Sequence, residues 1–149
     1  WLTIYSQEKE VKNYSNKSLY NRIQSYLTFY QKEGVNQNDT IVVILKESED
    51  LIASFIAGII YGALPSFYAY PSPKQSKKQF IKSIKNLIQF NEIKLVISFL
   101  EVVDLLKSSF EMRNTNFVGF FDANEVCTNE FNIDNLTNIG FTRNTRISH

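Results

Sequence analysis

The stretch Ile41-Val42-Val43-Ile44-Leu45 is an unbroken aliphatic run, and Ser48-Glu49-Asp50 follows it after two intervening residues. A β-branched run of this kind is typical of a strand that is buried on both faces of a sheet. Ser48 is a favoured helix N-cap residue, and acidic side chains in the first turn suit the positive end of the helix dipole. We therefore expect a buried strand at residues 41–45, followed by a helix that runs to about Tyr61.

Beyond this unit, further apolar runs alternate with helical patterns. Pro65 interrupts the helical pattern, and residues 66–70, 95–99 and 117–121 each have the apolar character of a short strand. Helices are expected between these runs, one at 102–110 and one whose apolar side chains recur at helical spacing at Phe80, Ile84, Leu87 and Ile88. This order of elements predicts the α/β class, with a parallel sheet, right-handed crossovers and helices on both faces.

The N-terminal residues predict a hairpin and a helix. Residues 1–5 and 11–14 alternate apolar and polar side chains on either side of a turn-like segment at 7–10, which predicts an antiparallel hairpin. Ser15 can cap the next helix, and Gly34 is a suitable residue to end it. This helix has one apolar stripe, formed by Leu19, Ile23, Tyr26, Leu27 and Tyr30. We expect the hairpin to be an appendage of the parallel sheet.

The chain starts at Trp1 without a signal-peptide pattern, and we expect it to be a fragment, a processed product or the ordered part of something longer. We place an α/β subdomain at residues 1–121 and a polar, loop-rich extension at 122–149, where no clear period is found. The longest apolar run, 51–64, is too short to cross a bilayer. Its Gly58-x-x-x-Gly62 spacing could mark a membrane helix dimer, but a buried helix packed closely on a sheet is the preferred interpretation.

The composition is that of an ordinary globular protein, with 44% hydrophobic and 21% charged residues. Sixteen basic and fifteen acidic residues give a net charge of +1, which argues against a nucleic-acid-binding protein, since such proteins usually carry a clear basic excess. The single cysteine, Cys127, excludes an internal disulfide framework and a thiolate zinc cluster. A reducing, cytoplasmic location fits this cysteine content, and we expect no transmembrane segment.

The sequence offers few residues for catalysis. The five glycines are too widely spaced for a dinucleotide- or phosphate-binding loop, and the one histidine, His149, is the last residue. Cys127 has no internal histidine to activate it, so an inert thiol is favoured over a nucleophile. Glu49 and Asp50 are interpreted as partners of the helix dipole rather than as proton-transfer groups. We therefore assign no catalytic, cofactor-binding or metal-binding residue, and the substrate-binding residues stay unassigned.

Two clusters of side chains suggest binding. Lysines gather without an intervening acid at Lys74, Lys77, Lys78, Lys82 and Lys85. They could steer a phosphate-bearing partner such as an acyl carrier protein or coenzyme A, although a solvated helix face is the simpler interpretation. The aromatic group Phe67, Tyr68 and Tyr70 could line a hydrophobic ligand channel, but a strand that packs into the core is favoured.

Several short segments of the sequence are distinctive when they are taken together and in order. YSNKSL at residues 14–19 opens a helix that ends in EGV at 33–35, and NDTIVVIL follows at 38–45. KESEDL at 46–51 is then followed by FIAGIIYGALP at 55–65. In this order the segments resemble the start of the adenylate-forming superfamily, which comprises acyl-CoA synthetases, fatty acyl-AMP ligases and the adenylation domains of peptide synthetases. Asn38 departs from the glycine that this family usually has at that position, and the likeness weakens after residue 100.

The continuation YPSPKQ at residues 70–75 is more similar to fatty acyl-AMP ligases and acyl-CoA ligases than to amino-acid-activating domains. The resemblance implies a parent enzyme that joins a carboxylic acid, such as a fatty acid, to the α-phosphate of ATP. Pyrophosphate is released, and the acyl-adenylate passes its acyl group to coenzyme A or a carrier protein. The family's ATP- and Mg²⁺-binding motifs would lie downstream of His149, so the resemblance implies an N-terminal fragment that is inactive alone, with the remainder of the ligase as its partner.

Other hypotheses stay open. The chain could be a non-catalytic α/β interaction or docking module on the same scaffold, which a stop codon directly after His149 would favour. A Ser/Thr-rich Gly-x-Thr-Gly loop soon after His149 would favour the ligase. A flavodoxin-like nucleotide binder has less support, because no phosphate loop follows residues 41–45. If the chain is a first subdomain, we also expect an exposed apolar patch where its neighbour is missing.

Overall fold

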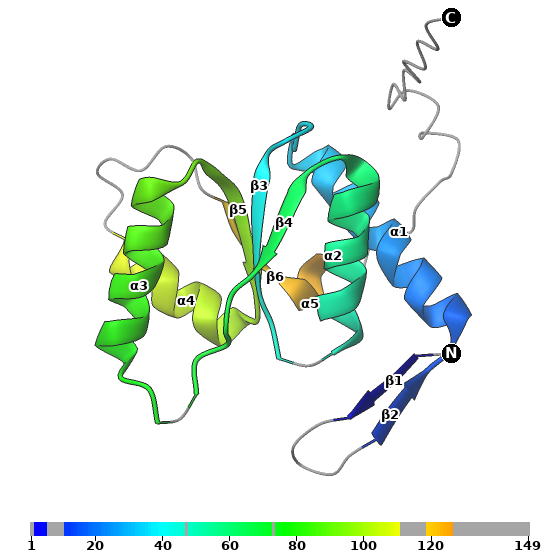
Figure 1. Ribbon diagram of the computed structural model, residues 1–149, viewed down its shortest axis with the longest axis horizontal. Helices are drawn as coiled ribbons and strands as arrows, with labels where there is room; N and C mark the ends of the chain where they lie inside the picture. The colour runs from blue at the N-terminus through cyan, green and yellow to red at the C-terminus, as the bar shows by residue number, and fades with distance from the viewer. Residues whose placement is uncertain (1, 6–10, 47, 73, 111–118, 127–149) are drawn as a thin grey trace, which may run out of the picture.

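The computed structural model describes residues 2–5, 11–46, 48–72, 74–110 and 119–126, with side chains from residue 13 onward. Its centre is a four-stranded parallel sheet in the order β4-β3-β5-β6 (Figure 1). The strands are β3 (Thr40–Ile44), β4 (Leu64–Phe67), β5 (Ile93–Ser98) and β6 (Gly119–Asp122). The predicted parallel sheet is confirmed.

Helices cover both faces of this sheet, as predicted (Figure 1). One face carries α1 (Asn16–Lys32), α2 (Glu49–Tyr61) and the short α5 (Ala123–Val126). The other face carries α3 (Lys77–Phe90) and α4 (Leu100–Ser109). The chain is therefore a three-layer α/β structure in the described ranges.

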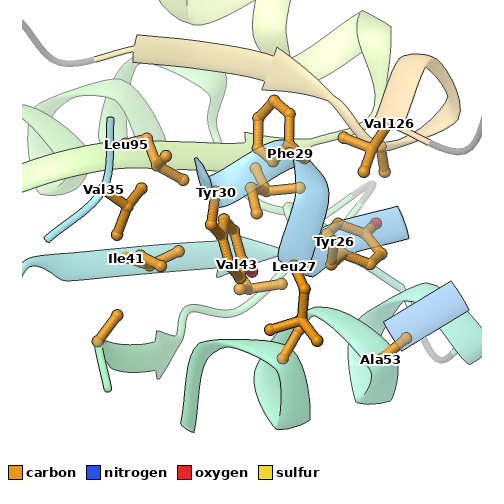
Figure 2. Close-up of a cluster of buried hydrophobic side chains, with 14 of the residues drawn as sticks. Tyr26, Leu27, Phe29, Tyr30, Val35, Ile41, Val43, Ala53, Leu95 and Val126 are labelled. Carbon is orange, nitrogen blue, oxygen red and sulfur yellow. The ribbon is translucent and has the colours of Figure 1, made fainter. Parts of the chain in front are cut away.

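The alternation of side chains along β3 separates two hydrophobic cores. Ile41 and Val43 point into the core beneath α1 and α2, whereas Val42 and Ile44 point into the core beneath α3 and α4. In the first core, Tyr26, Leu27 and Tyr30 of α1 lie over β3 (Figure 2). A strand that is buried on both faces has to be apolar at every position, which explains the continuous aliphatic run that the sequence has there.

The N-terminal hairpin forms its own two-stranded sheet. Strand β1 (Leu2–Tyr5) pairs antiparallel with β2 (Val11–Tyr14), with Leu2 opposite Tyr14. The pairing agrees with the predicted hairpin, whose connecting residues 6–10 lie outside the described residues.

Local signals fix the ends of α1 and α2. The Ser15 hydroxyl accepts a hydrogen bond from the Ser18 amide at 3.0 Å, so Ser15 caps α1 as predicted. The Ser48 hydroxyl accepts from the Leu51 amide at 3.3 Å and caps α2. Gly62 ends α2 in the left-handed conformation, with φ of 87°.

The edge strand β4 differs from its predicted position, because it begins at Leu64 rather than at residue 66 and includes Pro65. The Leu64 amide donates to the Asp39 carbonyl, and the Tyr68 amide donates to the Val43 carbonyl, both at 2.9 Å. Alternate residues therefore bond to β3, and Pro65 falls at a position whose N–H would point to the free edge. Proline is tolerated there because no ladder hydrogen bond is lost.

Helix and strand structure continues past residue 121 to residue 126 in the described ranges. Strand β6 continues to Asp122, and Ala123 and Val126 of α5 are buried in the first core. A four-residue helix is too short to produce a recognisable period, so the sequence pattern did not indicate it. Residues 117–118 and 127–149 lie outside the described residues, and the division into 1–121 and 122–149 stays a prediction.

Helix α2 packs closely on the sheet through Gly58. A Cβ atom at Gly58 would lie 3.0 Å from the Cβ atom of Pro65 in β4. The predicted close packing of this helix on the sheet is confirmed at Gly58, but the helix is not fully buried, because Ile59 and Ile60 are exposed. In the described ranges, no helix combines the length and hydropathy that a membrane crossing needs.

Candidate functional site at the carboxyl edge of the sheet

The carboxyl ends of the neighbouring strands β3 and β5 form a topological switch point. From β3 the chain passes through α2 to β4 on one side, and from β5 it passes through α4 to β6 on the other side. Helices α2 and α4 lie on opposite faces of the sheet. Open α/β sheets commonly bind ligands outside the carboxyl ends of their strands at such a point.

Four side chains gather at this edge, and we call them the Tyr70 cluster: Lys46, Tyr70, Phe99 and Glu101. Lys46 follows β3, Tyr70 follows β4, and Phe99 and Glu101 follow β5. The Tyr70 hydroxyl donates a hydrogen bond to the Glu101 carboxylate. The Lys46 ammonium lies 4.9 Å from the centre of the Tyr70 ring, and Phe99 meets that ring edge-on at 6.0 Å.

Burial raises the pKa of the Tyr70 hydroxyl well above its ordinary value, and the hydrogen bond and negative charge of Glu101 raise it further. The phenol is therefore a proton donor at neutral pH, and it orients the Glu101 carboxylate. The cluster ties the segment after β4 to the start of α4. It also leaves one ammonium group exposed, Lys46, which can meet a negative charge at the switch point.

Two buried polar residues at the same edge, Ser98 and Asp122, form hydrogen bonds within the protein. The Ser98 hydroxyl at the end of β5 donates to the Ile44 carbonyl of β3 at 2.7 Å. The Asp122 carboxylate accepts from the amide and the side chain of Asn124, each at 3.1 Å, and so supports the start of α5. The first bond joins the carboxyl ends of β5 and β3, and the Asp122 bonds are local to the turn from β6 into α5.

The fold of the chain matches that of solved ligase structures. The chain aligns with the adenylation domain of a keto acid-selecting peptide-synthetase module bound to a keto acyl adenylate, with a TM-score of 0.70 at 14% identity over 88% of this chain and 24% of that one. A structure from a study of fatty acyl-adenylate ligases of E. coli and L. pneumophila gives a TM-score of 0.69 at 11% identity, over 86% of this chain and 24% of that one. VinN gives a TM-score of 0.57 at 18% identity, over 76% of this chain and 26% of that one. The chain has an adenylate-forming ligase fold.

The likeness to these ligases concerns the fold, and the chain spans about a quarter of the length of each matched structure. No protein-family profile matches the sequence, and no curated protein sequence matches it either. The resemblance to adenylate-forming enzymes that the sequence motifs predicted is thus confirmed at the level of three-dimensional structure.

The departure at Asn38 from the ligase pattern has a conformational reason. Asn38 has φ of 67°, in the left-handed region that favours glycine. Asparagine tolerates this conformation better than other side chains. The Asn38 amide also donates to the Gly62 carbonyl at 2.8 Å, so the turn before β3 is held against the end of α2. Asparagine at this position is therefore compatible with the left-handed turn before β3.

Glu49 and Asp50 lie in the first turn of α2, as predicted, and both are buried. Asp50 does more than match the helix dipole, because its Oδ1 accepts from the Tyr26 hydroxyl at 3.2 Å and lies 3.3 Å from Nε of Arg22. The carboxylate thus ties α2 to α1. The sequence could not reveal this, since both partners lie more than twenty residues away. Glu49 keeps one buried carboxylate oxygen with no hydrogen-bond partner in the described ranges.

The aromatic group after α2 is divided between different surroundings. Tyr68 packs against Phe80 in the second core, as the favoured interpretation expected. Phe67 does not pack into the core: it is 53% exposed and stacks on Phe55 of α2 at 4.4 Å. The expectation fails for Phe67 because β4 is an edge strand whose outer side lacks a neighbour among the described residues. Tyr70 joins the cluster at the carboxyl edge.

An apolar surface lies on the outer side of α2, and we call it the α2 outer face: Ile52, Phe55, Ile56, Ile59, Ile60 and Phe67. Ile59 is 58% exposed and Ile60 is 43% exposed. After Asp50, α2 has no charged residue. A helix that is apolar on all sides is normally covered, which makes this exposed surface unusual. The idea that a missing neighbour covers it stays a prediction.

The remaining candidate residues are placed as follows. The five predicted lysines are exposed on and just before α3. Cys127 and His149 lie outside the described residues. Among the described residues, no group of three or more metal-ligating side chains converges. The sequence interpretation missed Lys46 and Glu101, although their positions directly after expected strands could have indicated them.

Proposed function

We propose that this chain is the N-terminal part of an enzyme that activates a carboxylic acid by adenylation. The complete enzyme would join the carboxylate to the α-phosphate of ATP and release pyrophosphate. It would then pass the acyl group to coenzyme A or to a carrier protein. Fatty acids are the first substrate class to test, because the segment at residues 70–75 is more similar to fatty acyl-AMP ligases and acyl-CoA ligases than to amino-acid-activating domains.

The observation that carries this proposal is the shared fold over 76–88% of the chain. Three of the matched structures are described as complexes with an acyl adenylate, a phenylalanyl-adenylate or a keto acyl adenylate. Those ligands differ in the acyl group and share a carboxylate joined to adenylate. This shared chemistry supports carboxylate activation as the proposed reaction, and it does not specify which acyl group is activated.

The described residues do not themselves fit a magnesium–triphosphate complex. Adenylation needs donors fixed around the phosphates, such as the closely spaced backbone amides of a glycine-rich loop or convergent carboxylates for Mg²⁺. The described glycines are Gly34 after α1, Gly58 within α2, Gly62 at the end of α2 and Gly119 in β6, so they form no glycine-rich loop, and no carboxylates converge on a metal site in these ranges. The contribution that we propose for this part of the chain is the scaffold beneath the carboxyl edge.

The decisive experiment is to read the transcript beyond the codon for His149. A Ser/Thr/Gly-rich loop within the next few dozen codons is expected, and a stop codon there would overturn the proposal in favour of a non-catalytic docking module. The longer protein should then catalyse pyrophosphate exchange that depends on a carboxylic acid, tested with a panel of fatty, keto and amino acids. A cytoplasmic location, consistent with the single cysteine, is part of this proposal.

A further inference from the structure

The charge of the chain is distributed very unevenly. Residues 74–94 contain six lysines and one acidic residue, whereas the other 128 residues contain ten basic and fourteen acidic residues. Five of these lysines form what we call the α3 lysine stripe: Lys74, Lys77, Lys78, Lys82 and Lys85. All five are exposed, and none forms an ion pair within the described part of the chain.

The stripe is unfavourable for α3 in isolation. Lys77 and Lys78 occupy the first turn, where the helix dipole disfavours positive charge, and Ser76 provides no side-chain cap. Lys78 and Lys82 are four residues apart, and like charges at this spacing repel by about 0.2–0.5 kcal/mol. An ordinary solvated helix relieves such repulsion with interspersed acids, but α3 has none. Burial of Phe80 and Ile84 holds the helix in place in spite of this.

We propose that the α3 lysine stripe is the docking surface for an acidic protein helix. Lys74, Lys78, Lys82 and Lys85 follow one another at spacings of four, four and three residues, with Lys77 beside Lys78. The helical part of the stripe, residues 77–85, extends for about 12 Å at 1.5 Å per residue. A second helix that carries carboxylates at the same spacing can lie against it and pair with successive ammonium groups. Docking would replace the repulsion within the stripe by attraction, and it does not depend on the adenylation proposal.

The chemistry of the stripe favours a protein over a lipid surface or a nucleic acid. A membrane-surface helix needs apolar side chains beside its lysines, but the outward residues between them, such as Gln79, are polar. The exposed Phe90 lies more than one turn beyond Lys85. Nucleic-acid surfaces usually combine lysine with arginine and stacking aromatic residues, and residues 74–94 contain no arginine.

The test uses the whole chain and a fluorescent helical peptide with glutamates at every third or fourth position. Anisotropy should show binding that weakens steeply with salt. The variant K77Q/K78Q/K82Q should bind about tenfold more weakly or worse, since each exposed pair contributes about 0.2–1 kcal/mol. The control K17Q/K32Q/K107Q changes exposed lysines on other helices and has the same net charge, so its affinity should change by less than about threefold.

Circular dichroism of both variants should be that of the unchanged chain. The proposal is overturned if the peptide does not bind, or if both triple variants lose affinity equally, because net charge alone would then be responsible. It is also overturned if phosphatidylserine–phosphatidylcholine vesicles or single-stranded DNA bind the chain more tightly than the peptide and lose affinity in the K77Q/K78Q/K82Q variant.

Discussion

The Tyr26 hydroxyl donates a hydrogen bond to Oδ1 of Asp50 at 3.2 Å, and this buried contact joins α1 to α2. A comparable tyrosine one turn later, Tyr30, donates to the Ser54 carbonyl at 2.8 Å. The two bonds connect the same helices but differ in their acceptor. One acceptor is a carboxylate and the other is a neutral carbonyl, so their contributions to stability should differ.

Removing the Tyr26 hydroxyl should cost more than removing the Tyr30 hydroxyl. Bonds to charged groups contribute about 1.5–3 kcal/mol and neutral bonds about 1 kcal/mol. We expect Tyr26→Phe to lower the free energy of unfolding by about 2 kcal/mol and Tyr30→Phe by about 1 kcal/mol, measured by urea denaturation. In double-mutant cycles with Asp50→Ala, Tyr26 should show coupling and Tyr30 should be additive. Equal costs, or no coupling at Tyr26, would contradict this account.

The glycines that end α1 and α2 provide a second, matched pair. Gly34 and Gly62 both have positive φ, at 63° and 87°. A Cβ at Gly34 would meet nothing within 4 Å, whereas one at Gly62 would lie 3.2 Å from Cγ of Gln37. Gly34→Ala should therefore lower the free energy of unfolding by about 1 kcal/mol, because of the left-handed backbone alone. Gly62→Ala should lower it by about 1 kcal/mol more, because the contact with Gln37 adds to the same backbone strain. Thermal melts should show the larger drop in melting temperature for Gly62→Ala, and equal drops in the two variants would show that the contact with Gln37 is unimportant.

The α2 outer face should make the isolated chain self-associate. We expect analytical ultracentrifugation to show a concentration-dependent sedimentation coefficient. Ile59→Glu should weaken the association by about tenfold or more, because burying an aliphatic side chain is worth about 1.5–3 kcal/mol. Tyr20→Glu is the control, since Tyr20 is similarly exposed, at 51% against 58%, but lies on α1. A chain that stays monomeric at all concentrations, or an equal effect of the two changes, would show that this face is not adhesive.

Local chemistry explains which parts of this fold could be predicted. The caps at Ser15 and Ser48 and the glycine at position 34 act within a few residues, so the sequence alone located the ends of two helices. The exposure of Phe67 could not be predicted, because it depends on β4 being an edge strand. Likewise, the Tyr70 cluster assembles from three separate strand ends, and only the topology brings them together.

The Tyr70 cluster should be detectable by alkaline titration. The folded structure raises the pKa of Tyr70 above the ordinary value of 10.0, so the fold favours the protonated phenol. Its contribution to stability is complete below pH 10.0 and is lost as the pH rises further. Ultraviolet absorbance of tyrosinate should show a late-titrating group that disappears in Tyr70→Phe. In Glu101→Gln the same group should titrate earlier, since a negative charge and a hydrogen-bond acceptor are removed. If the titration of this group were unchanged in Glu101→Gln, the contact between Tyr70 and Glu101 would be contradicted.

The last prediction concerns the activity of these 149 residues alone. We expect no appreciable binding of Mg·ATP in calorimetric titrations and no carboxylate-dependent pyrophosphate exchange. The physical reason is that adenylation depends on donors fixed around the α-phosphate, and the packing of a scaffold does not replace them. Lys46 at the switch point is a single exposed ammonium group, which gives a weak interaction with a solvated phosphate. The Lys46→Gln variant should therefore give the same calorimetric trace as the unchanged chain. Micromolar ATP binding that Lys46→Gln abolishes would overturn this prediction and would locate a nucleotide site in the Tyr70 cluster. Pyrophosphate exchange that appears only when downstream sequence is restored would support the prediction.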